Sequence, residues 1–321
     1  MDVDSVLKVK KHTSLQQRFP SINSASNLIR QQAGLLVYGR RITPELLADI
    51  AAYVGDDLDV VAAWKVGSYD ALLIRDELSA LLEQALIHFR LDYASTSDLP
   101  DLSEPGLVVM DMDSTAIEIE CIDEIAVLAG VGEQVAEVTE RAMQGELDFE
   151  QSLRQRVATL AGADESILES VRSTLPMMPE LRELVATLHH YGWKVAIASG
   201  GFTYFSDYLK QELQLDHAQS NTLEIVDGKL TGKVLGDVVD AQVKADILRE
   251  LADQHEIALH NTVAVGDGAN DLVMLKAAGL GVAYHAKPKV EAEAPAVIRQ
   301  ADLGGVMCIL SASLMPQGIS W

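Results

Sequence analysis

The sequence predicts an α/β protein built on a doubly wound parallel sheet, with a smaller α+β domain at its N-terminal end. From about residue 106 onward, short apolar runs typical of buried strands alternate with segments of helical periodicity. Several of these runs stop abruptly in a loop of acidic or glycine residues. Residues 34–94 show a separate alternation of strands and helices, followed by a stretch of Ser, Asp and Pro.

Composition narrows the class of protein. The chain has 321 residues, 48% of them hydrophobic, which is enough to bury cores for two or three domains. Its formal net charge of −23 argues against nucleic-acid binding, which needs a basic surface. No apolar run approaches the ~18 residues of a membrane span, and residues 1–20 lack the apolar core of a secretory signal. Two distant cysteines predict a reducing, cytoplasmic location.

The N-terminal domain is predicted to span residues 1–94, with a loose lead-in over 1–33. After the lead-in we expect a strand, a helix that Thr43 caps and Pro44 begins, two strands, a helix and a last strand. The expected ranges are 34–39, 44–54, 59–66, 69–74, about 78–86 and 91–94. This β-α-β-β-α-β order is ferredoxin-like and is similar to that of amino-acid-binding ACT domains. An effector sensor and a structural or dimerising module both remain open. Residues 95–105 are the expected linker.

The catalytic part, 106–321, is expected to begin with a buried strand over 106–110. Four helical segments follow before the second strand, at 117–130, 135–143, 149–161 and 165–175, and predict a helical cap over about 117–178. Asp227-Gly228 is a strong type I′ hairpin signal. The remaining expected elements are helix 179–191, strand 193–198, helix 204–213, hairpin 223–234, helix 241–255 capped by Asp240, strand 262–265, helix 272–278 and strand 281–284.

Chemistry-bearing residues follow three of these strands, and one more lies on a helix. Ligands of open α/β sheets bind just beyond the carboxyl ends of the strands. The residues are Asp111 and Asp113 after the first strand, Ser199-Gly200-Gly201 after the second, Lys244 on the helix capped by Asp240, and Gly266-Asp267-Gly268-Ala269-Asn270-Asp271 after the strand at 262–265. Taken alone, the first pair is equally consistent with an acidic turn. The ordered set is far more specific.

This ordered set resembles the haloacid dehalogenase superfamily of phosphotransfer enzymes, whose sheet is Rossmann-like. Within it, the stretches 118–124, 149–157 and 265–271 resemble the phosphoserine phosphatases, and the N-terminal extension is similar to that of their longer bacterial form. The resemblance implies hydrolysis of O-phospho-L-serine through an aspartyl-phosphate, the last step of L-serine biosynthesis, with Mg²⁺ as cofactor.

The chemistry of a phosphate monoester suggests roles for the two leading carboxylates. Asp111 is expected to be the nucleophile, because an ordinary Asp is ionised at pH 7. Asp113 is expected to protonate the leaving oxygen and then to deprotonate the attacking water. Clustered carboxylates need a cation, and oxygen ligands suit Mg²⁺. The resemblance implies that Asp111 and Asp267 bind the metal through side chains and Asp113 through its backbone carbonyl, while Asp271 orients a ligand or a metal-bound water.

The resemblance also implies a set of substrate residues. Ser199 and the backbone of Gly200 would hold the phosphoryl oxygens at a helix N-terminus. Lys244 would neutralise phosphate charge, and Asn270 would hydrogen-bond the phosphate or the substrate. In the cap, Glu120 would bind the ammonium of phosphoserine and Arg156 its carboxylate. Periodicity alone is equally consistent with Glu120 and Arg156 as solvated cap charges.

Three other functions compete with the one that the resemblance implies. An ion-pumping ATPase conflicts with the carboxylate at Asp113 and with the lack of membrane spans. A phosphatase of the same superfamily for another small ester, and a serine-binding regulator built on the N-terminal domain, remain alternatives. The partner is therefore expected to be a small molecule, neither nucleic acid nor membrane, with a homodimer through the N-terminal domain as a further possibility.

Overall fold

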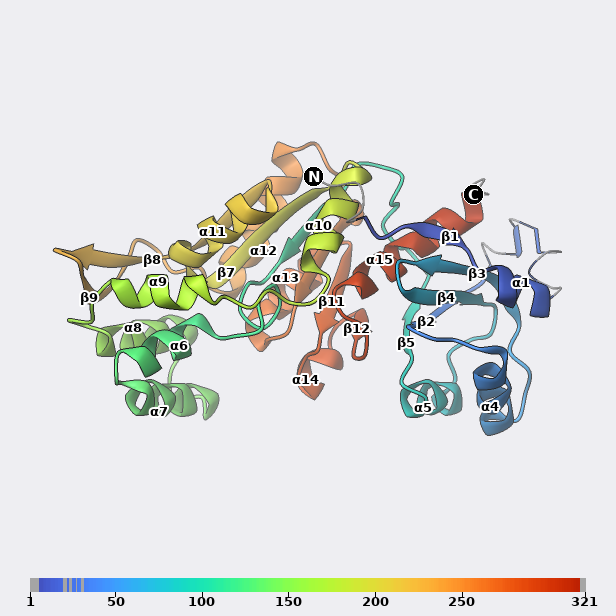
Figure 1. The fold of residues 1–321 in the computed structure, drawn as a ribbon, viewed down its shortest axis with the longest axis horizontal. Helices are drawn as coiled ribbons and strands as arrows, with labels where there is room; N and C mark the ends of the chain where they lie inside the picture. The colour runs from blue at the N-terminus through green and yellow to red at the C-terminus, as the bar shows by residue number, and fades with distance from the viewer. Residues whose placement is uncertain (1–5, 20–21, 23–24, 27, 30–31, 318–321) are drawn as a thin grey trace.

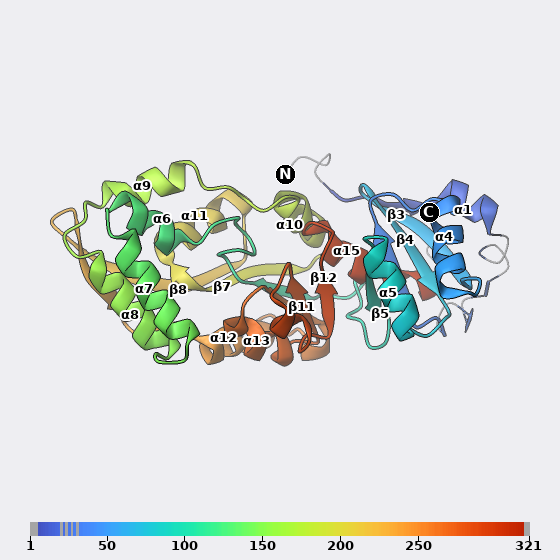
Figure 2. The same cartoon turned by 90° about the horizontal axis from the view of Figure 1, so that it is seen from below.

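The computed structural model describes residues 6–19, 22, 25–26, 28–29 and 32–317. The catalytic sheet lies in the middle of an elongated molecule, with the N-terminal domain at one end and the helical cap at the other (Figures 1 and 2). Among the helices of the described ranges, none is long and apolar enough to cross a membrane.

The N-terminal domain is an antiparallel sheet with two helices on one face. Its sheet has the order β1-β3-β4-β2-β5, so the strands that follow the lead-in confirm the ferredoxin-like prediction. Thr43 caps the first of these helices by accepting the N–H of Leu46, and Gly55 ends that helix with a left-handed φ of 83°. The elements are β2 (Leu35–Gly39), α4 (Pro44–Val54), β3 (Val60–Val66), β4 (Tyr69–Ile74), α5 (Ala80–His88) and β5 (Asp92–Ser95).

The lead-in is less loose than its weak periodicity indicates. Strand β1 (Val9–Lys11) pairs antiparallel with β3, with Val9 opposite Val66. The short helix α1 (Thr13–Arg18) follows, and the buried side chain of His12 caps it. Neither element is long enough to show a hydrophobic period, so pairing with β3 rather than local sequence specifies them.

The catalytic sheet has seven strands in the order β12-β11-β10-β6-β7-β8-β9. All neighbouring pairs are parallel except β8 and β9, which form an antiparallel hairpin. Strand β6 is central, with β7 on one side and β10 on the other. Strands β7, β8 and β9 follow one another outward on one side of β6, and β10, β11 and β12 on the other, so the strand order reverses at β6. The strands are β6 (Leu107–Met110), β7 (Lys194–Phe202), β8 (His217–Val226), β9 (Lys229–Leu235), β10 (Thr262–Gly266), β11 (Leu280–Tyr284) and β12 (Ala296–Ile298).

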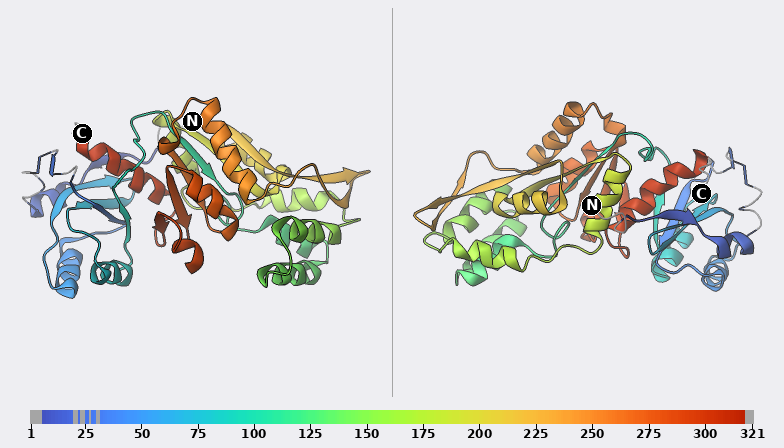
Figure 3. Two further views of the ribbon diagram at one scale, coloured as in Figure 1. Left: turned by 180° about the vertical axis from the view of Figure 1, so that it is seen from behind. Right: turned by 45° about the horizontal axis from the view of Figure 1, so that its top comes forward.

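Helices cover both faces of this sheet, as predicted for a doubly wound fold. Alternate residues of β6 point to opposite faces: Leu107 and Val109 join the core beneath α12 (Ala241–Gln254) and α13 (Leu272–Ala277). Val108 and Met110 join the core of the other face, which α10 (Leu181–His190), α11 (Thr203–Leu213) and α15 (Gly304–Ser311) line. Figure 3 shows the two helical layers from behind and from above.

The cap is an all-helical insertion between β6 and α10, as predicted. Its helices are α6 (Cys121–Leu128), α7 (Gly132–Met143), α8 (Phe149–Thr159) and α9 (Ser166–Ser173). The two connections to the core pair with each other, since Ile117 bridges Met177. The tip of the β8–β9 hairpin has φ of 50° at Asp227 and 74° at Gly228, the positive values that a type I′ turn requires.

One helix start was predicted wrongly. Pro179 was expected to begin a helix, but α10 begins at Leu181, because Glu180 takes a left-handed φ of 65°. The Glu180 side chain explains this geometry: it accepts the Tyr69 hydroxyl at 2.8 Å and the N–H of Gly304 at 3.2 Å. Tertiary contacts thus override the local proline signal.

The N-terminal domain shares a core with the catalytic domain. Helix α15 packs against the open face of the N-terminal sheet, and Trp64 Nε1 donates to Ser311 Oγ at 2.8 Å. Asp92 at the start of β5 accepts backbone N–H groups that follow β12, from Arg299 at 2.9 Å and Ala301 at 2.7 Å. The predicted linker, 95–105, is also held in place, because Leu102 is fully buried.

We expect Asp92→Ala to lower the free energy of unfolding by about 2–4 kcal/mol, because it leaves several buried backbone N–H groups without an acceptor. Urea unfolding followed by tryptophan fluorescence measures this loss, since Trp64 and Trp193 report on the two domains. Asp57→Ala, on the exposed loop before β3, is the control. Equal stability of the two variants would contradict a domain clamp at Asp92.

Candidate active site

A cleft of about 380 Å³ lies between the cap and the carboxyl ends of the central strands. Its floor comes from the loops after β6 and β10 and from the last residues of β7, which meet because these strands are parallel neighbours. Its roof comes from α6, α7 and α8 of the cap. The predicted site residues that line it are Asp111, Asp113, Glu120, Arg156, Ser199, Gly200, Asp267 and Asn270.

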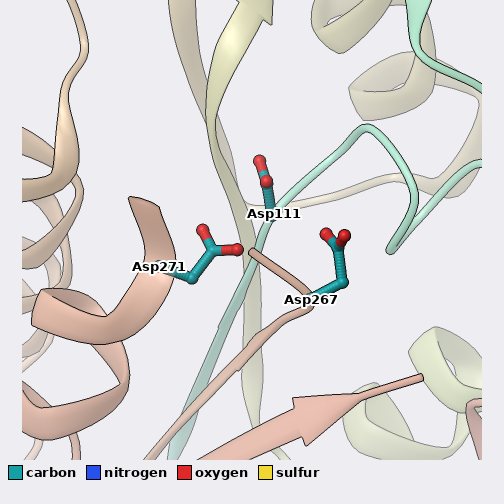
Figure 4. A group of neighbouring side chains, drawn as sticks. All are labelled: Asp111, Asp267 and Asp271. Carbon is teal, nitrogen blue, oxygen red and sulfur yellow. The ribbon is translucent and has the colours of Figure 1, made fainter. Parts of the chain in front are cut away.

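Three carboxylates converge on the floor (Figure 4). One oxygen from each of Asp111, Asp267 and Asp271 lies within 4.8 Å of the others. Asp111 follows β6, Asp267 follows β10, and Asp271 stands where α13 begins, so adjacent strand ends bring them together. The side chain of Asp113 lies outside this group.

Lys244 is the cation beneath these carboxylates. Its Nζ lies 2.9 Å from Asp111 Oδ1 and 2.8 Å from Asp271 Oδ1, and its side chain is 0% exposed. Burial alone lowers the pKa of Lys244, but the two carboxylates outweigh that effect and raise the pKa above its ordinary value. Asp240 caps α12 and so fixes the turn that carries this lysine. Lys244 therefore belongs to the buried site and is not a solvated surface lysine.

Asp113 faces the cap rather than Lys244. Its Oδ1 accepts the backbone N–H of Cys121 at 3.1 Å, at the start of α6. Burial, together with the charges of Glu120 and Asp111, raises the pKa of Asp113 to about 8. A carboxyl group that holds its proton near neutral pH is suited to donate it to a leaving oxygen.

The other carboxylates favour a divalent cation. Burial and the charges of its acidic neighbours raise the pKa of Asp267 to about 7. Burial and Asp111 raise the pKa of Asp271 to about 6, although Lys244 opposes the shift. These raised pKa values indicate repulsion between neighbouring carboxylates that Lys244 does not fully compensate. A hard cation would relieve it, and the donor set fits Mg²⁺. Thr115 Oγ1 donates to Asp267 Oδ1 at 3.2 Å and orients it.

The irregular end of β7 over Ser199-Gly200-Gly201, called the glycine loop below, approaches Asp113 so closely that it needs glycine. A Cβ on Gly201 would lie 2.6 Å from Asp113 Oδ2, and one on Gly200 would lie 2.6 Å from the ring of Phe149 in the cap. The buried Ser199 Oγ accepts the N–H of Gly201 at 2.9 Å. Its hydroxyl proton is therefore available to a phosphoryl oxygen in the cleft.

The cap contributes two charged residues of opposite sign. Ser114 Oγ donates to Glu120 Oε1 at 2.8 Å, which orients that carboxylate at the rim. Arg156 on α8 lines the cleft, and burial lowers its pKa. Its buried Nε has no hydrogen-bond partner in the described part of the chain. A guanidinium in this state is suited to receive an anionic group of a ligand.

Sequence reasoning missed several residues of the site. The signal for Thr115 was available, because it lies in the motif that supplies Asp111. Phe149 lies in a stretch that carried the family resemblance, and its ring contact with the glycine loop appears only in three dimensions. The backbone of Cys121 holds Asp113, a role that no side-chain pattern reports.

The fold and the cleft define a class: a capped α/β protein with a cluster of carboxylates at the carboxyl ends of its central strands. The family model for haloacid dehalogenase-like hydrolases matches residues 105–279. A model for a domain of unknown function matches residues 31–95.

Individual relatives narrow the class further. The chain is 63% identical to the phosphoserine phosphatase of Vibrio cholerae over all of its own length and 98% of that protein. It superposes on the unliganded crystal structure of a probable phosphoserine phosphatase from Vibrio cholerae with a TM-score of 0.92, over 99% of this chain and all of that one, at 62% identity. A phosphoserine phosphatase solved as a phospho-aspartyl intermediate analogue aligns over 64% of this chain and 98% of its own, with 42% identity and a TM-score of 0.60.

The chain belongs to the phosphoserine phosphatase family of haloacid dehalogenase-like hydrolases. It is therefore an enzyme, a phosphoric monoester hydrolase, as the ordered motifs predict.

The raised pKa of Asp267 predicts a pH-dependent stability of the metal-free protein. Its folded pKa of about 7 exceeds the ordinary value, so the folded state binds the extra proton and stability falls as pH rises toward 7. With a chelator present, we expect Asp267→Asn to melt at least about 2 °C higher than wild type at pH 8, which corresponds to about 1 kcal/mol.

Near pH 4 the gain should become small, because Asp267 is then protonated in the folded state and about half protonated in the unfolded state. Differential scanning calorimetry at both pH values measures the effect, with Asp237→Asn, on an exposed loop, as the control. A variant that melts lower than wild type at pH 8 would contradict carboxylate repulsion.

Proposed function

We propose that this protein hydrolyses O-phospho-L-serine to L-serine and phosphate, with Asp111 as the nucleophile. The observation that carries the proposal is the position of Asp111 on the cleft floor, at the end of the central strand and beside the buried ammonium of Lys244. The relative solved as a phospho-aspartyl intermediate analogue supports the same chemistry.

The first step transfers the phosphoryl group to the enzyme. A carboxylate oxygen of Asp111 attacks phosphorus while the bond between phosphorus and the serine oxygen breaks. Asp113 gives its proton to that oxygen, so serine leaves as the neutral alcohol. Ser199 and the backbone of Gly200 bind the phosphoryl oxygens, with Asn270 at the cleft wall as a further donor.

The second step hydrolyses the aspartyl-phosphate. Asp113, now ionised, takes a proton from water, and the resulting oxygen attacks phosphorus as the bond to Asp111 breaks. Inorganic phosphate leaves, and both carboxyl groups return to their starting states. Lys244 holds a positive charge beside Asp111 throughout, because its ammonium stays protonated under the influence of two carboxylates.

We assign Mg²⁺ to the carboxylate cluster. The side chains of Asp111 and Asp267 and the backbone carbonyl of Asp113 would hold it, while Asp271, which Lys244 already engages, would orient a ligand or a bound water. The bound ion would supply positive charge against the phosphoryl oxygens. The oxygen-only donor set and the raised pKa values support this choice.

The cap supplies selectivity for an amino-acid ester. Glu120 pairs with the substrate ammonium and Arg156 with its carboxylate, so the two charges of the cap match the two charges of serine. The buried Nε of Arg156 without a partner supports this assignment. Another small phosphate ester is the alternative substrate, and one without a carboxylate would leave that guanidinium unpaired.

The remaining expectations concern the whole chain. We propose a cytoplasmic enzyme that catalyses the last step of L-serine biosynthesis. The two free, buried cysteines support the cytoplasmic location. We propose domain bounds of 1–94, a linker over 95–105 and a catalytic domain over 106–321 with its cap at about 117–178. A homodimer through the N-terminal domain, and an effector site in that domain, stay predictions.

Asp111→Asn should lose at least about a thousandfold in kcat, because an amide is a poor nucleophile for phosphorus. Release of inorganic phosphate from phosphoserine with Mg²⁺ measures this loss against wild type. A crystal grown with beryllium fluoride and Mg²⁺ should show the adduct on a carboxylate oxygen of Asp111. An adduct on another side chain would overturn the assignment.

Arg156→Ala should raise KM for phosphoserine by about tenfold to a hundredfold, the effect of losing a charge-assisted carboxylate contact. KM for p-nitrophenyl phosphate, which lacks the carboxylate, should change far less. Arg154→Ala is the matched control, since Arg154 lies on the same helix and pairs with Glu150 outside the cleft. Equal losses on both substrates would count against Arg156 as the carboxylate ligand.

A further inference from the structure

A buried amide next to the phosphoryl-binding loop has no role in the mechanism described so far. Asn221 lies on β8 opposite Phe202 of β7 and is 1% exposed. Asn is uncommon at such a depth unless its polar groups are paired. The hydrogen-bond partners of its side chain are backbone groups of two segments that are distant in sequence.

The Asn221 side chain bridges these two segments. Its Nδ2 donates to the carbonyl of Gly200 at 2.8 Å, and its Oδ1 accepts the N–H of Val239 at 2.8 Å. The first of these segments is the glycine loop at the end of β7, which carries the proposed phosphoryl-binding residues. The second leads directly into Asp240, the cap of the helix that bears Lys244. One side chain thus sets the spacing between the phosphoryl-binding loop and that helix.

The bond to Gly200 also orients Ser199. The carbonyl of Gly200 and the N–H of Gly201 belong to one planar peptide unit, so fixing the carbonyl fixes the N–H. That N–H donates to Ser199 Oγ at 2.9 Å, which directs the remaining hydroxyl proton toward the cleft. Rotation of this peptide would release Ser199 and turn the Gly200 carbonyl, a repelling dipole, toward the phosphate.

We propose that Asn221 is a positioning residue for phosphoryl transfer, which holds the loop of Ser199 and Gly200 in register with Lys244. This inference rests on the proposed function, because it gives those residues the phosphoryl group as their ligand. Asn221 touches no reacting atom and acts through Gly200 and Val239. Its contribution is the geometry of the loop, to which phosphoryl transfer is sensitive.

The test compares two variants of Asn221 with a neighbour on the same strand. Asn221→Asp keeps the size and the acceptor for Val239 but sets an oxygen against the Gly200 carbonyl, and Asn221→Ala removes both bonds. Ser220→Ala is the control, because Ser220 is also buried and its bond to Ser206 Oγ at 2.6 Å reaches α11, not the active-site loops. Melting temperature, kcat and the inhibition constant of inorganic phosphate are measured for each full-length protein with Mg²⁺, well below its melting temperature.

We expect both Asn221 variants to lose about tenfold to a hundredfold in kcat. Inorganic phosphate should inhibit them correspondingly less, and the loss should be equal for phosphoserine and p-nitrophenyl phosphate, because the loop binds the phosphoryl group that both share. Ser220→Ala should lower the melting temperature with unchanged kcat and phosphate inhibition. A merely structural Asn221 would behave in the same way as this control.

Asn221 variants with wild-type kcat and phosphate inhibition would overturn the inference, as would failure of both variants to fold. A wild-type protein that releases no phosphate from phosphoserine would instead refute the proposed function, so the two failures are distinguishable.

Discussion

The active site depends on one buried ion triad, in which the ammonium of Lys244 touches Asp111 and Asp271. Burying one cation costs several kcal/mol, and only close opposite charges repay it. The triad therefore requires the three parent elements, β6, α12 and α13, to keep their relative positions. The core beneath α12 and α13 supplies that rigidity, because Leu107 and Val109 of β6 belong to the same buried core as residues of both helices.

The order of the strands in the sheet places the cleft beside this triad. Strand β6 stands between β7 and β10, so the carboxyl ends of these three strands meet at one edge. Asp111, the proposed nucleophile, then has the glycine loop on one side and the carboxylates that follow β10 on the other. The cap lies over this edge, and the bridge between its two connections, at Ile117 and Met177, comes directly after the loop that carries Asp111 and Asp113.

The sequence could predict whatever was locally encoded. Thr43-Pro44 predicted a helix start and Asp227-Gly228 a hairpin turn, because the backbone geometry at both places depends on those residues themselves. The carboxylate cluster was predictable because strand ends of a parallel sheet must meet. Features that depend on contacts between distant segments could not be predicted. They include the three-residue strand β12 and the hydrogen bonds of Asp92 that link the two domains. They also include the left-handed backbone of Glu180, whose side chain is held by partners far along the chain.

The charge of the chain poses a problem that these contacts resolve. A protein of net charge −23 repels an anionic ester at long range, yet salt screens exposed charges beyond about 8 Å. Inside the cleft the nearest groups decide: Lys244 below, Arg156 above, and the N–H groups of the glycine loop between them. Partly buried cations keep their strength where surface charges lose theirs. Binding of an anionic ester at this site would therefore depend on local geometry, and a change that moves the glycine loop away from Lys244 would weaken it without altering the net charge.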